Sequence, residues 1–320
     1  MQAARVHQFG KALVVEEAPE LEPQPDEVLV RVEACGVCHS DLHMIRGDWP
    51  DVAKRTPMPA TLGHEVVGRV VHAGAQAQGL AAGARVGVGW LYSTCEVCEF
   101  CRDNAENICL YRQVTGLAAP GGFAEYIRIR ASHAVPVPES LKAEEAAPLF
   151  CAGLTVFHAL RNCGVQAGQR VAIFGIGGLG HLAAQLAAHV GAHVIGVDVS
   201  EVAARQAKAR YPALMAAVID LDRFSWPDRA FDVILNFYFL SRPLCRQYRY
   251  LLRPGGVLIF ESLLKETVIY RPDFNPDYLL APGELRELCA GLEILVYREG
   301  WISRAGHHPR AVASLVARRS

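Results

Sequence analysis

Long apolar runs are absent from this sequence of 320 residues. None approaches the roughly 20 consecutive residues that a membrane helix needs. The formal net charge is -1, so no excess of one sign favours nucleic acid or an acidic membrane surface. The first twenty residues mix charges with short apolar pieces and lack the apolar core of a signal peptide. We therefore expect a soluble, cytoplasmic protein with neither a nucleic-acid nor a membrane partner.

Internal repeats and low-complexity tracts are also absent. Hydrophobic residues make up 51% of the chain and charged residues 20%, which describes a folded globular protein. The length suffices for two domains of ordinary size. Long helix-period segments are missing before LKAEEAAPLFCAGLTVFHALRNC (141–163), whereas EVLVRVEA (27–34) and EVVGRVVHAG (65–74) are typical of β-strands. Residues 1–140 are therefore predicted to form a β-rich, barrel-like domain.

The pattern changes from residue 171 onward, where predicted strands alternate with predicted helices. This alternation predicts a doubly wound parallel sheet, so the expected fold class is α/β. The last two strands are joined only by an irregular link, which favours an antiparallel edge. Residues 141–320 are therefore predicted to form a nucleotide-binding domain. Its expected strands are 171–175, 193–198, 231–237, 256–262, 292–300 and 310–319, and its expected helices are 178–191, 201–211 and 241–252.

The chain has ten cysteines, and four of them lie within CEVCEFCRDNAENIC (95–109). In a reducing compartment this clustering favours a metal over disulfides. Four thiolates can close a tetrahedron around zinc and leave no position for water or substrate, which makes such a site structural. The predicted ligands are Cys95, Cys98, Cys101 and Cys109.

A second group of metal-binding residue types is scattered along the chain. CGVCHSDLH contains Cys38, GHEVVG contains His64 and APLFCAGLT contains Cys151. Two sulfurs and one imidazole would make a three-ligand set with an open fourth position, as a catalytic zinc requires. An isolated cysteine or histidine is usually a packed core residue, so the choice of these three rests on the motifs around them.

The segment VAIFGIGGLG has Gly175, Gly177 and Gly180 in a G-x-G-x-x-G pattern, after a predicted strand and at the opening of a predicted helix. Asp198 ends the next strand, twenty-three residues beyond Gly175. This context predicts a dinucleotide loop whose backbone approaches a pyrophosphate, with Asp198 on the adenosine ribose. A negative charge there would repel a 2′-phosphate and favour NAD over NADP. S-adenosylmethionine sites use a similar loop, but typically with an acidic residue at the position of Phe174.

Residues 1 to about 198 resemble the zinc-dependent alcohol dehydrogenases of the medium-chain dehydrogenase/reductase superfamily. The stretches that carry the resemblance are CGVCHSDLH, GDWP, TLGHEVVG, the four-cysteine segment, GGFAEYI, APLFCAGLTVFHAL and FGIGGLGH. The resemblance implies a GroES-like β-rich domain, followed by a Rossmann-like domain. It also implies two zinc ions per chain. The catalytic zinc of this family is held by two cysteines and one histidine, and the four-cysteine segment would hold the structural zinc.

The resemblance assigns a role to each matching position. Cys38, His64 and Cys151 match the catalytic zinc ligands, and Asp41 and Glu65 match carboxylates that orient them. Ser40 and His43 match a proton relay. The remaining matches are His39 at the cofactor pyrophosphate, Gly175, Gly177, Gly178, Leu179, Gly180 and Asp198 at the cofactor, and Trp49 and Trp90 at the alcohol pocket.

The chain from about residue 195 to its end resembles instead a class I S-adenosylmethionine-dependent methyltransferase of the tellurite-resistance type. The stretches are DVSEVAARQAKAR, FDVILNFYFLSRPL, LLRPGGVLIFES and RPDFNPDYLLAPGELREL. That family's sheet ends in an antiparallel hairpin, but its own glycine loop is not expected in this part of the chain. The C-terminal return that completes a dehydrogenase is not recognisable. The chain is therefore predicted to be a mosaic.

The function predicted from these residues is hydride transfer between a primary alcohol or aldehyde and NAD(H), catalysed with zinc. One alternative is a methyltransferase with a dehydrogenase-like N-terminal part. Another is an inactive mosaic that binds zinc and a nucleotide. The expected partner is a small alcohol or aldehyde, and a homo-oligomer is one of the assembly states left open.

Overall fold

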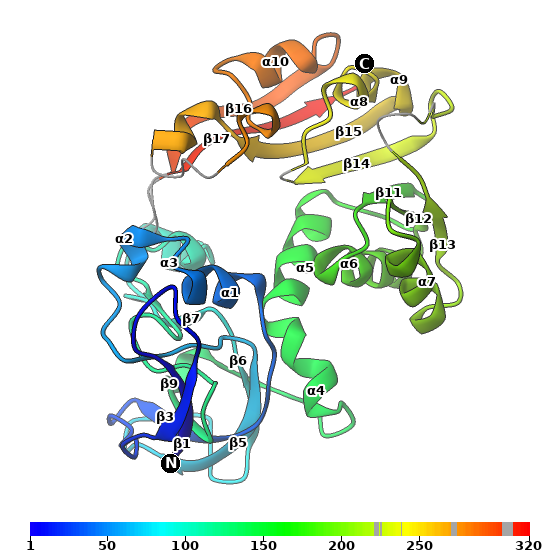
Figure 1. Cartoon of the computed structure of the whole chain (residues 1–320). Helices are drawn as coiled ribbons and strands as arrows, with labels where there is room; N and C mark the ends of the chain where they lie inside the picture. Colours follow the sequence, from blue (N-terminus) through cyan, green and yellow to red (C-terminus); the bar gives the residue numbers. More distant parts are fainter. Residues whose placement is uncertain (221–223, 225, 238, 270–273, 303–309) are drawn as a thin grey trace. The chain divides into compact units, whose positions relative to one another are not determined.

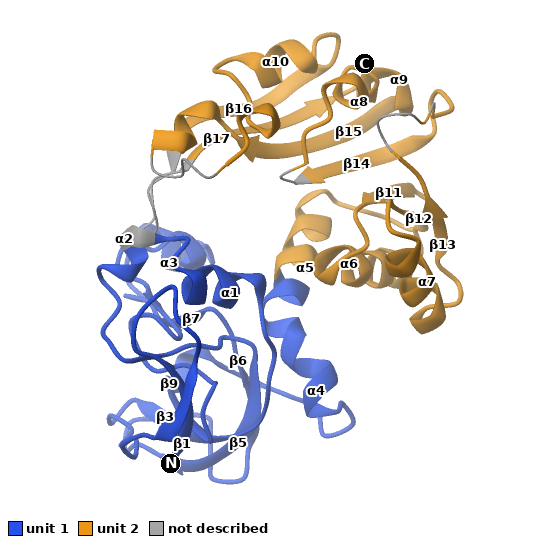
Figure 2. Cartoon of the chain, viewed as in Figure 1, with its two compact units in different colours: residues 1–154, 304–308 blue, residues 155–303, 309–320 orange. Residues whose placement is uncertain are grey.

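The computed structural model describes residues 1–220, 224, 226–237, 239–269, 274–302 and 310–320 (Figure 1). They fall into two compact units, residues 1–154 and the described part of residues 155–320 (Figure 2). The division lies within helix α5 (Ala152–Asn162). The domain boundary at residue 140 stays a prediction.

The first unit is built on antiparallel β-sheet, as predicted. Among its described residues, five strands pair in the order β10-β6-β5-β3-β9, three in the order β2-β1-β4, and β7 pairs with β8. The strands are β1 (Gln2–Val6), β2 (Val14–Glu17), β3 (Glu27–Cys35), β4 (Ala60–Thr61), β5 (Val66–Ala73), β6 (Arg85–Val88), β7 (Leu91–Ser93), β8 (Gln113–Val114), β9 (Tyr126–Arg130) and β10 (Ala134–Pro136).

Alternate residues of these strands form the core of the first unit. Val28 and Val30 of β3 face the same side and pack with Val70 of β5 and with Ile127 and Ile129 of β9, all of them buried. A strand places every second side chain on one face, so this packing follows from the alternating pattern in the sequence. The candidate metal-binding side chains lie in the segments outside these strands.

Short helices interrupt the first unit. They are α1 (His39–Arg46), α2 (Pro50–Ala53), α3 (Glu99–Arg102), η1 (Glu106–Ile108), η2 (Ala131–His133), α4 (Ala143–Ala146) and η3 (Ala147–Phe150). Helix α1 was not predicted, because only Asp41 and Met44 are buried along it and it has no long apolar stripe. The Asp41 carboxylate accepts from the Cys38 N–H at 2.9 Å and so caps the start of this helix.

The second unit contains one sheet of seven strands among its described residues, in the order β13-β12-β11-β14-β15-β17-β16. Neighbours from β13 to β15 pair in parallel, and β17 is antiparallel to both β15 and β16. The strands are β11 (Arg170–Phe174), β12 (His193–Asp198), β13 (Met215–Val218), β14 (Phe231–Phe237), β15 (Leu252–Leu263), β16 (Glu293–Ile302) and β17 (Arg310–Arg318).

Helices cover both faces of this sheet. On one face Val171 and Ile173 pack against α5 and α6. On the other face Ala172 belongs to a core with Leu244 of α8 and Tyr248 of α9. The helices are α6 (Gly178–His189), α7 (Glu201–Arg210), α8 (Arg242–Cys245), α9 (Tyr248–Leu251), η4 (Lys265–Ile269), η5 (Pro276–Tyr278) and α10 (Glu284–Leu288).

These observations confirm the predicted doubly wound, Rossmann-like sheet with an antiparallel C-terminal edge. Three details differ from the expectation. Strand β13 was not predicted, because it is only four residues long and has two exposed and two half-buried residues. The helix expected over 241–252 is two short helices separated by Arg246 and Gln247. The last strand is inserted between β15 and β16, so the order departs from the 3-2-1-4-5-6 order of a dinucleotide-binding sheet.

Two further findings concern the whole described chain. Every described strand after Asp198 pairs within the seven-stranded sheet. Within the described ranges, no helix has both the length and the apolar character needed to cross a membrane.

Candidate metal centres and nucleotide loop

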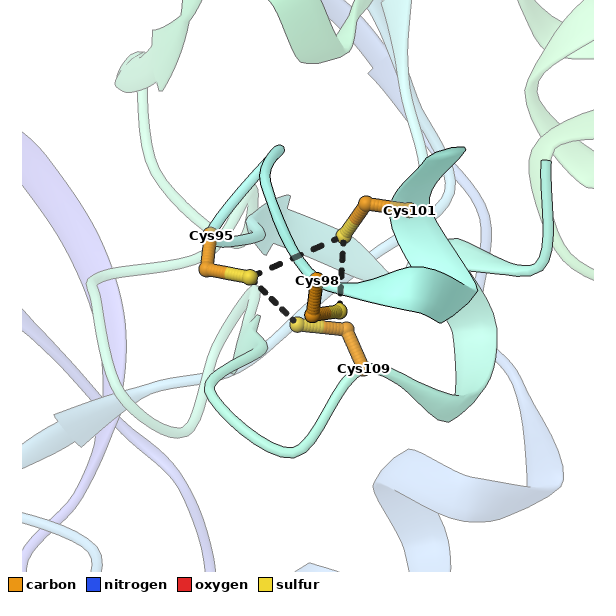
Figure 3. Close-up of side chains that lie close together, drawn as sticks. All are labelled: Cys95, Cys98, Cys101 and Cys109. Atoms are coloured by element: carbon orange, nitrogen blue, oxygen red, sulfur yellow. Dashed lines mark hydrogen bonds between the residues drawn. The ribbon is translucent and has the colours of Figure 1, made fainter. Parts of the chain in front are cut away.

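The four cysteines between β7 and β8 bring their sulfur atoms together (Figure 3). The Sγ–Sγ distances are 3.5 Å for Cys98–Cys101, 3.6 Å for Cys95–Cys109 and 3.9 Å for Cys95–Cys101. Zinc–sulfur bonds of about 2.3 Å in a tetrahedron would separate the sulfurs by about 3.8 Å. The thiol set therefore fits a closed zinc site.

The local chain explains how four sulfurs converge over so few residues. Cys98 is the N-cap of the single turn α3, Cys101 lies in that turn, and Cys109 follows η1. Backbone N–H groups of Val97 and Cys98 lower the pKa of the Cys95 thiol to about 6, so this sulfur is a thiolate at neutral pH. A thiolate is the form that binds metal.

The second metal-binding group is assembled from three separate places in the first unit. Ligand atoms of Cys38, His64, Glu65 and Cys151 all lie within 4.8 Å of one another. Cys38 is the N-cap of α1, His64 and Glu65 lie between β4 and β5, and Cys151 follows η3. The Sγ atoms of Cys38 and Cys151 are 3.7 Å apart, again close to the edge of a zinc tetrahedron.

His64 is oriented as a metal ligand would be. Its side chain is buried, and Nδ1 lies 3.3 Å from Oδ1 of Asp41. Its Nε2 atom is also buried, and among the described residues it has no hydrogen-bond partner. Asp41 is held in turn by the backbone N–H groups of Cys38 at 2.9 Å and Gly63 at 3.2 Å. A bare imidazole nitrogen whose partner nitrogen donates to a carboxylate is the arrangement expected around zinc.

The electrostatics of this group suit a cation. Cys151 and the amide of Ser40 lower the pKa of Cys38, while Cys38 and burial raise the pKa of Cys151. Burial opposes a charge on His64, but the hydrogen bond to Asp41 and the neighbouring Cys38 thiol outweigh it and raise its pKa to about 9. Without a cation, Cys38 is therefore the deprotonated group, while Cys151 and His64 retain their protons. Zinc would displace them on binding.

Glu65 was predicted only to orient the ligands, but its carboxylate lies among the candidate ligand atoms themselves. Its carboxylate belongs to the group within 4.8 Å, beside the sulfurs and His64. Burial and then the charge of Cys38 raise its pKa to about 7. Room for it depends on Gly36, because a Cβ at that position would overlap the Glu65 carboxylate.

The residues predicted for the relay lie on α1, directly after Cys38. The tryptophans predicted for the alcohol pocket contact histidines of the same unit. Ser40 and His43 are both on α1, and Nδ1 of His43 is 2.7 Å from Oδ2 of Asp48. The ring of Trp49 stacks on His43 at 5.4 Å and that of Trp90 meets His64 edge-on at 4.7 Å. Trp49 is also buried in a small core, so packing accounts for it as well. His39 is exposed at the start of α1. The roles of these side chains stay predictions.

Sequence reasoning missed Asp48. It lies in the GDWP stretch, which served only as a family signature. The glycine directly before Asp48 could have indicated this contact, because a glycine after a helix predicts a turn that brings the next residue back over the last helical turn.

The glycine loop connects β11 to α6 in the second unit. Gly175 has a φ of 85°. A Cβ at Gly180 would collide with the Gly175 carbonyl oxygen, whereas Gly177 and Gly178 face open space. The glycines therefore allow a tight turn and leave the backbone accessible at the helix N-terminus, as predicted for a pyrophosphate. Leu179 is 51% exposed at the same end of α6.

Asp198 is fixed beside this loop. Its Oδ2 accepts from the Ile176 N–H at 2.8 Å, and its Oδ1 accepts from the Ser200 N–H at 2.8 Å. These contacts hold the carboxylate at the end of β12, next to the turn. The structure thus joins Asp198 to the glycine loop, and the ribose contact stays a prediction.

Two protein families match different parts of the chain. Residues 24–139 match the family described as Alcohol dehydrogenase GroES-like domain. Residues 175–256 match the family described as Methyltransferase domain. Relatives and solved structures add to the first match.

An alcohol dehydrogenase from Geobacillus stearothermophilus is 46% identical over 201 residues, which are 63% of this chain and 59% of the relative. A cinnamyl alcohol dehydrogenase structure from Sorghum bicolor has a TM-score of 0.69 at 29% identity, covering 80% of this chain and 74% of that one. An alcohol dehydrogenase structure from Aeropyrum pernix has a TM-score of 0.66 at 31% identity, covering 81% and 78%. Over its first three fifths the chain is therefore similar to alcohol dehydrogenases. It spans about three fifths of the length of the curated relatives it matches.

The methyltransferase match confirms the second resemblance and shifts its start. It begins at Gly175, about twenty residues before the predicted start, and includes the glycine loop and Asp198. The glycine loop therefore belongs both to the dehydrogenase-like part and to the methyltransferase-like part of the chain. The residues that follow the loop, up to residue 256, match the methyltransferase domain.

Proposed function

We propose that the protein is a zinc-dependent oxidoreductase that transfers hydride between a primary alcohol or aldehyde and NAD(H). The observation that carries this proposal is the buried Nε2 of His64, which has no hydrogen-bond partner among the described residues and lies beside two thiols. The similarity of residues 24–139 to the alcohol dehydrogenase GroES-like domain supports it.

In this proposal Cys38, His64 and Cys151 hold a catalytic zinc. Bound zinc supplies Lewis-acid polarisation that lowers the pKa of an alcohol hydroxyl group. Asp41 keeps the imidazole in the tautomer with a bare Nε2, because its carboxylate can only accept a hydrogen bond from Nδ1. Cys95, Cys98, Cys101 and Cys109 hold a second, structural zinc. Glu65 orients the catalytic group and is close enough to reach the same cation.

The chain's own residues move the proton. The Ser40 hydroxyl takes the proton of the alcohol and His43 passes it on to water. Trp49 and Trp90 line the alcohol pocket, and His39 meets the cofactor pyrophosphate. Gly175, Gly177, Gly178, Leu179 and Gly180 cradle that pyrophosphate. The Asp198 carboxylate holds the ribose and disfavours a 2′-phosphate, so NAD is the proposed cofactor.

A second candidate function is S-adenosylmethionine-dependent methyl transfer. The match of residues 175–256 to a methyltransferase domain and the inserted strand β17 favour it. Against it, Phe174 stands where such sites typically carry an acidic residue. The Phe174 ring packs edge-on against Trp226 at 5.8 Å, so this position contributes to the core.

One set of measurements separates these functions. Zinc per chain is measured first, and thermal shifts are then recorded with NAD, NADP and S-adenosylmethionine, because a ligand that binds only the native state raises its stability. We expect about two zinc ions per chain, a shift with NAD, and NADH formation with ethanol or benzyl alcohol. A shift confined to S-adenosylmethionine would replace the proposal with the second function. Binding of NAD without turnover would indicate an inactive mosaic.

A further inference from the structure

A carboxylate lies against the imidazole of His43. Oδ2 of Asp48 is 2.7 Å from Nδ1 of His43, and the two side chains are only 25% and 33% exposed. No family match or comparison assigns a role to Asp48. Its contact with a predicted relay residue raises the question of what the carboxylate does there.

The local backbone brings Asp48 back over the last turn of α1. Gly47 adopts a left-handed conformation with φ of 76° and donates its N–H to the Met44 carbonyl at 3.0 Å. The Asp48 N–H then donates to the His43 carbonyl at 2.9 Å. Asp48 therefore contacts His43 through both its backbone and its side chain. Such a turn requires glycine, because a left-handed φ strains other residues.

A role in stabilising the helix end does not explain the carboxylate. The C-terminus of a helix carries a partial negative charge, so an acidic side chain there is unfavourable. An asparagine could make the same backbone hydrogen bond without that cost. The carboxylate is therefore best explained by its contact with the imidazole.

Two other rings fix the imidazole in place. Trp49 stacks on His43 with ring centroids 5.4 Å apart and planes 29° apart. His39, one helical turn earlier, lies 5.3 Å away. Trp49 is itself buried against Met44 and Val52, so the stacking surface is rigid. The ring plane and the Nδ1 edge are both constrained.

Resting on the proposed relay, we infer that Asp48 is a positioning residue that sets the tautomer of His43. A carboxylate only accepts hydrogen bonds, so Nδ1 of His43 must carry the hydrogen. A neutral imidazole has one N–H, and Nε2 is therefore left bare. No described residue bonds to Nε2 of His43. A bare Nε2 can accept the proton that the relay delivers.

The test is Asp48→Asn in the full-length, zinc-loaded protein. The asparagine amide can donate to Nδ1, so the variant should move the hydrogen of His43 to Nε2. Nitrogen-15 NMR of the imidazoles reads the tautomer without any turnover. We expect a change from the Nδ1–H to the Nε2–H form, a fall in kcat of about 10- to 100-fold, and a KM within about twofold of wild type. Asp48→Glu should restore most of kcat, since it keeps a carboxylate.

A matched control comes from a second histidine–carboxylate pair outside the site. Nε2 of His7 is 2.9 Å from Oε1 of Glu16 on β2. Glu16→Gln should leave kcat unchanged. A double variant gives the coupling: in a His43→Gln background, Asp48→Asn should have no further effect on kcat. An equal loss in both backgrounds would show that Asp48 acts on the fold alone.

The two proposals fail in different ways. Absence of alcohol oxidation by the wild-type protein would remove the proposed function, while the NMR result would still decide the tautomer. An Nε2–H form of His43 in the wild-type protein would overturn the role of Asp48. So would an unchanged tautomer in the Asp48→Asn variant.

Discussion

The two cysteine clusters are built in opposite ways. Cys95 and Cys109 are fourteen residues apart, and the four sulfurs between β7 and β8 converge through the single turn α3 and the 3-10 turn η1. Cys38 and Cys151 are 113 residues apart, and His64 comes from a third place in the chain. The first cluster is a product of local spacing, whereas the second exists only when the first unit has folded. They should therefore respond differently to mutation and to protons.

The largest difference is expected from Cys151→Ser. Loss of one of three ligands should remove the second cluster's zinc and lower turnover by roughly 1,000-fold or more. Zinc per chain, measured by atomic absorption, should fall by half, because the four-cysteine segment keeps its ion. Cys163→Ser is the matched control, since this half-buried thiol lies outside both clusters. Full turnover in Cys151→Ser would disprove the three-ligand set.

Lowering the pH should weaken zinc binding at the second cluster. In the metal-free protein the pKa of His64 is raised to about 9, so a proton occupies the imidazole below that pH. Zinc must displace this proton as well as the one that Cys151 retains, so its apparent affinity should fall by about tenfold or more per pH unit between pH 9 and pH 7.

Competition with a chromogenic chelator at three pH values measures this affinity. The Cys98→Ser variant is the appropriate sample, because only the second cluster then binds zinc. An affinity that does not change over this range would contradict the raised pKa.

Asp41→Asn should affect one cluster and spare the other. Its carboxylate holds His64, the Cys38 N–H and the Gly63 N–H, so the variant should weaken zinc at the second cluster by about 10- to 100-fold. Glu96→Gln is the control beside the four-cysteine segment, where the carboxylate accepts from the Ser132 hydroxyl and lies 4.0 Å from Nδ1 of His133. Chelator competition should show no change for that variant. Equal weakening of both ions by Asp41→Asn would mean that it acts on the whole unit.

The smallest effect on turnover is expected from Cys98→Ser. This variant should lose the zinc of the four-cysteine segment and lower the melting temperature by about 10 °C. Turnover at low temperature should stay within about threefold of wild type, since the second cluster does not use these residues. Faster proteolysis between Cys95 and Cys109 should accompany the loss. Loss of turnover in this variant would show that the second cluster depends on the zinc of the four-cysteine segment, which would contradict the prediction.

Strand and helix patterns predicted most of the second unit because the periodicity was strong there. The predicted segments 193–198 and 231–237 are β12 and β14 as observed. Strand β13 was not predicted because its four residues, none of them buried, show no clear alternation of apolar and polar side chains. Helix α1 escaped because its stability comes from the Asp41 cap and from packing of Met44. Short elements stabilised by tertiary contacts leave a weak signal in the sequence.

The mosaic nature of the chain was visible in the sequence, but the packing of its two parts was not. Phe174, from the dehydrogenase-like part, meets Trp226 and Tyr248 of the methyltransferase-like part at 5.8 Å and 6.5 Å. These residues belong to one buried core that extends from β11 to β17. Parallel pairing of β11 with β14 continues the sheet across the change of family. Both parts therefore contribute to a single hydrophobic core.

The sequence alone determined the four-cysteine segment and the glycine loop, because their chemistry depends on residues close together in the chain. It also determined the alternation of strands and helices, which follows from the period of apolar residues. Only the tertiary structure decided that Nε2 of His64 is buried without a partner among the described residues, that Glu65 lies beside the predicted ligands and that Asp48 contacts His43. Those facts depend on contacts between distant segments and on burial, which no local pattern encodes.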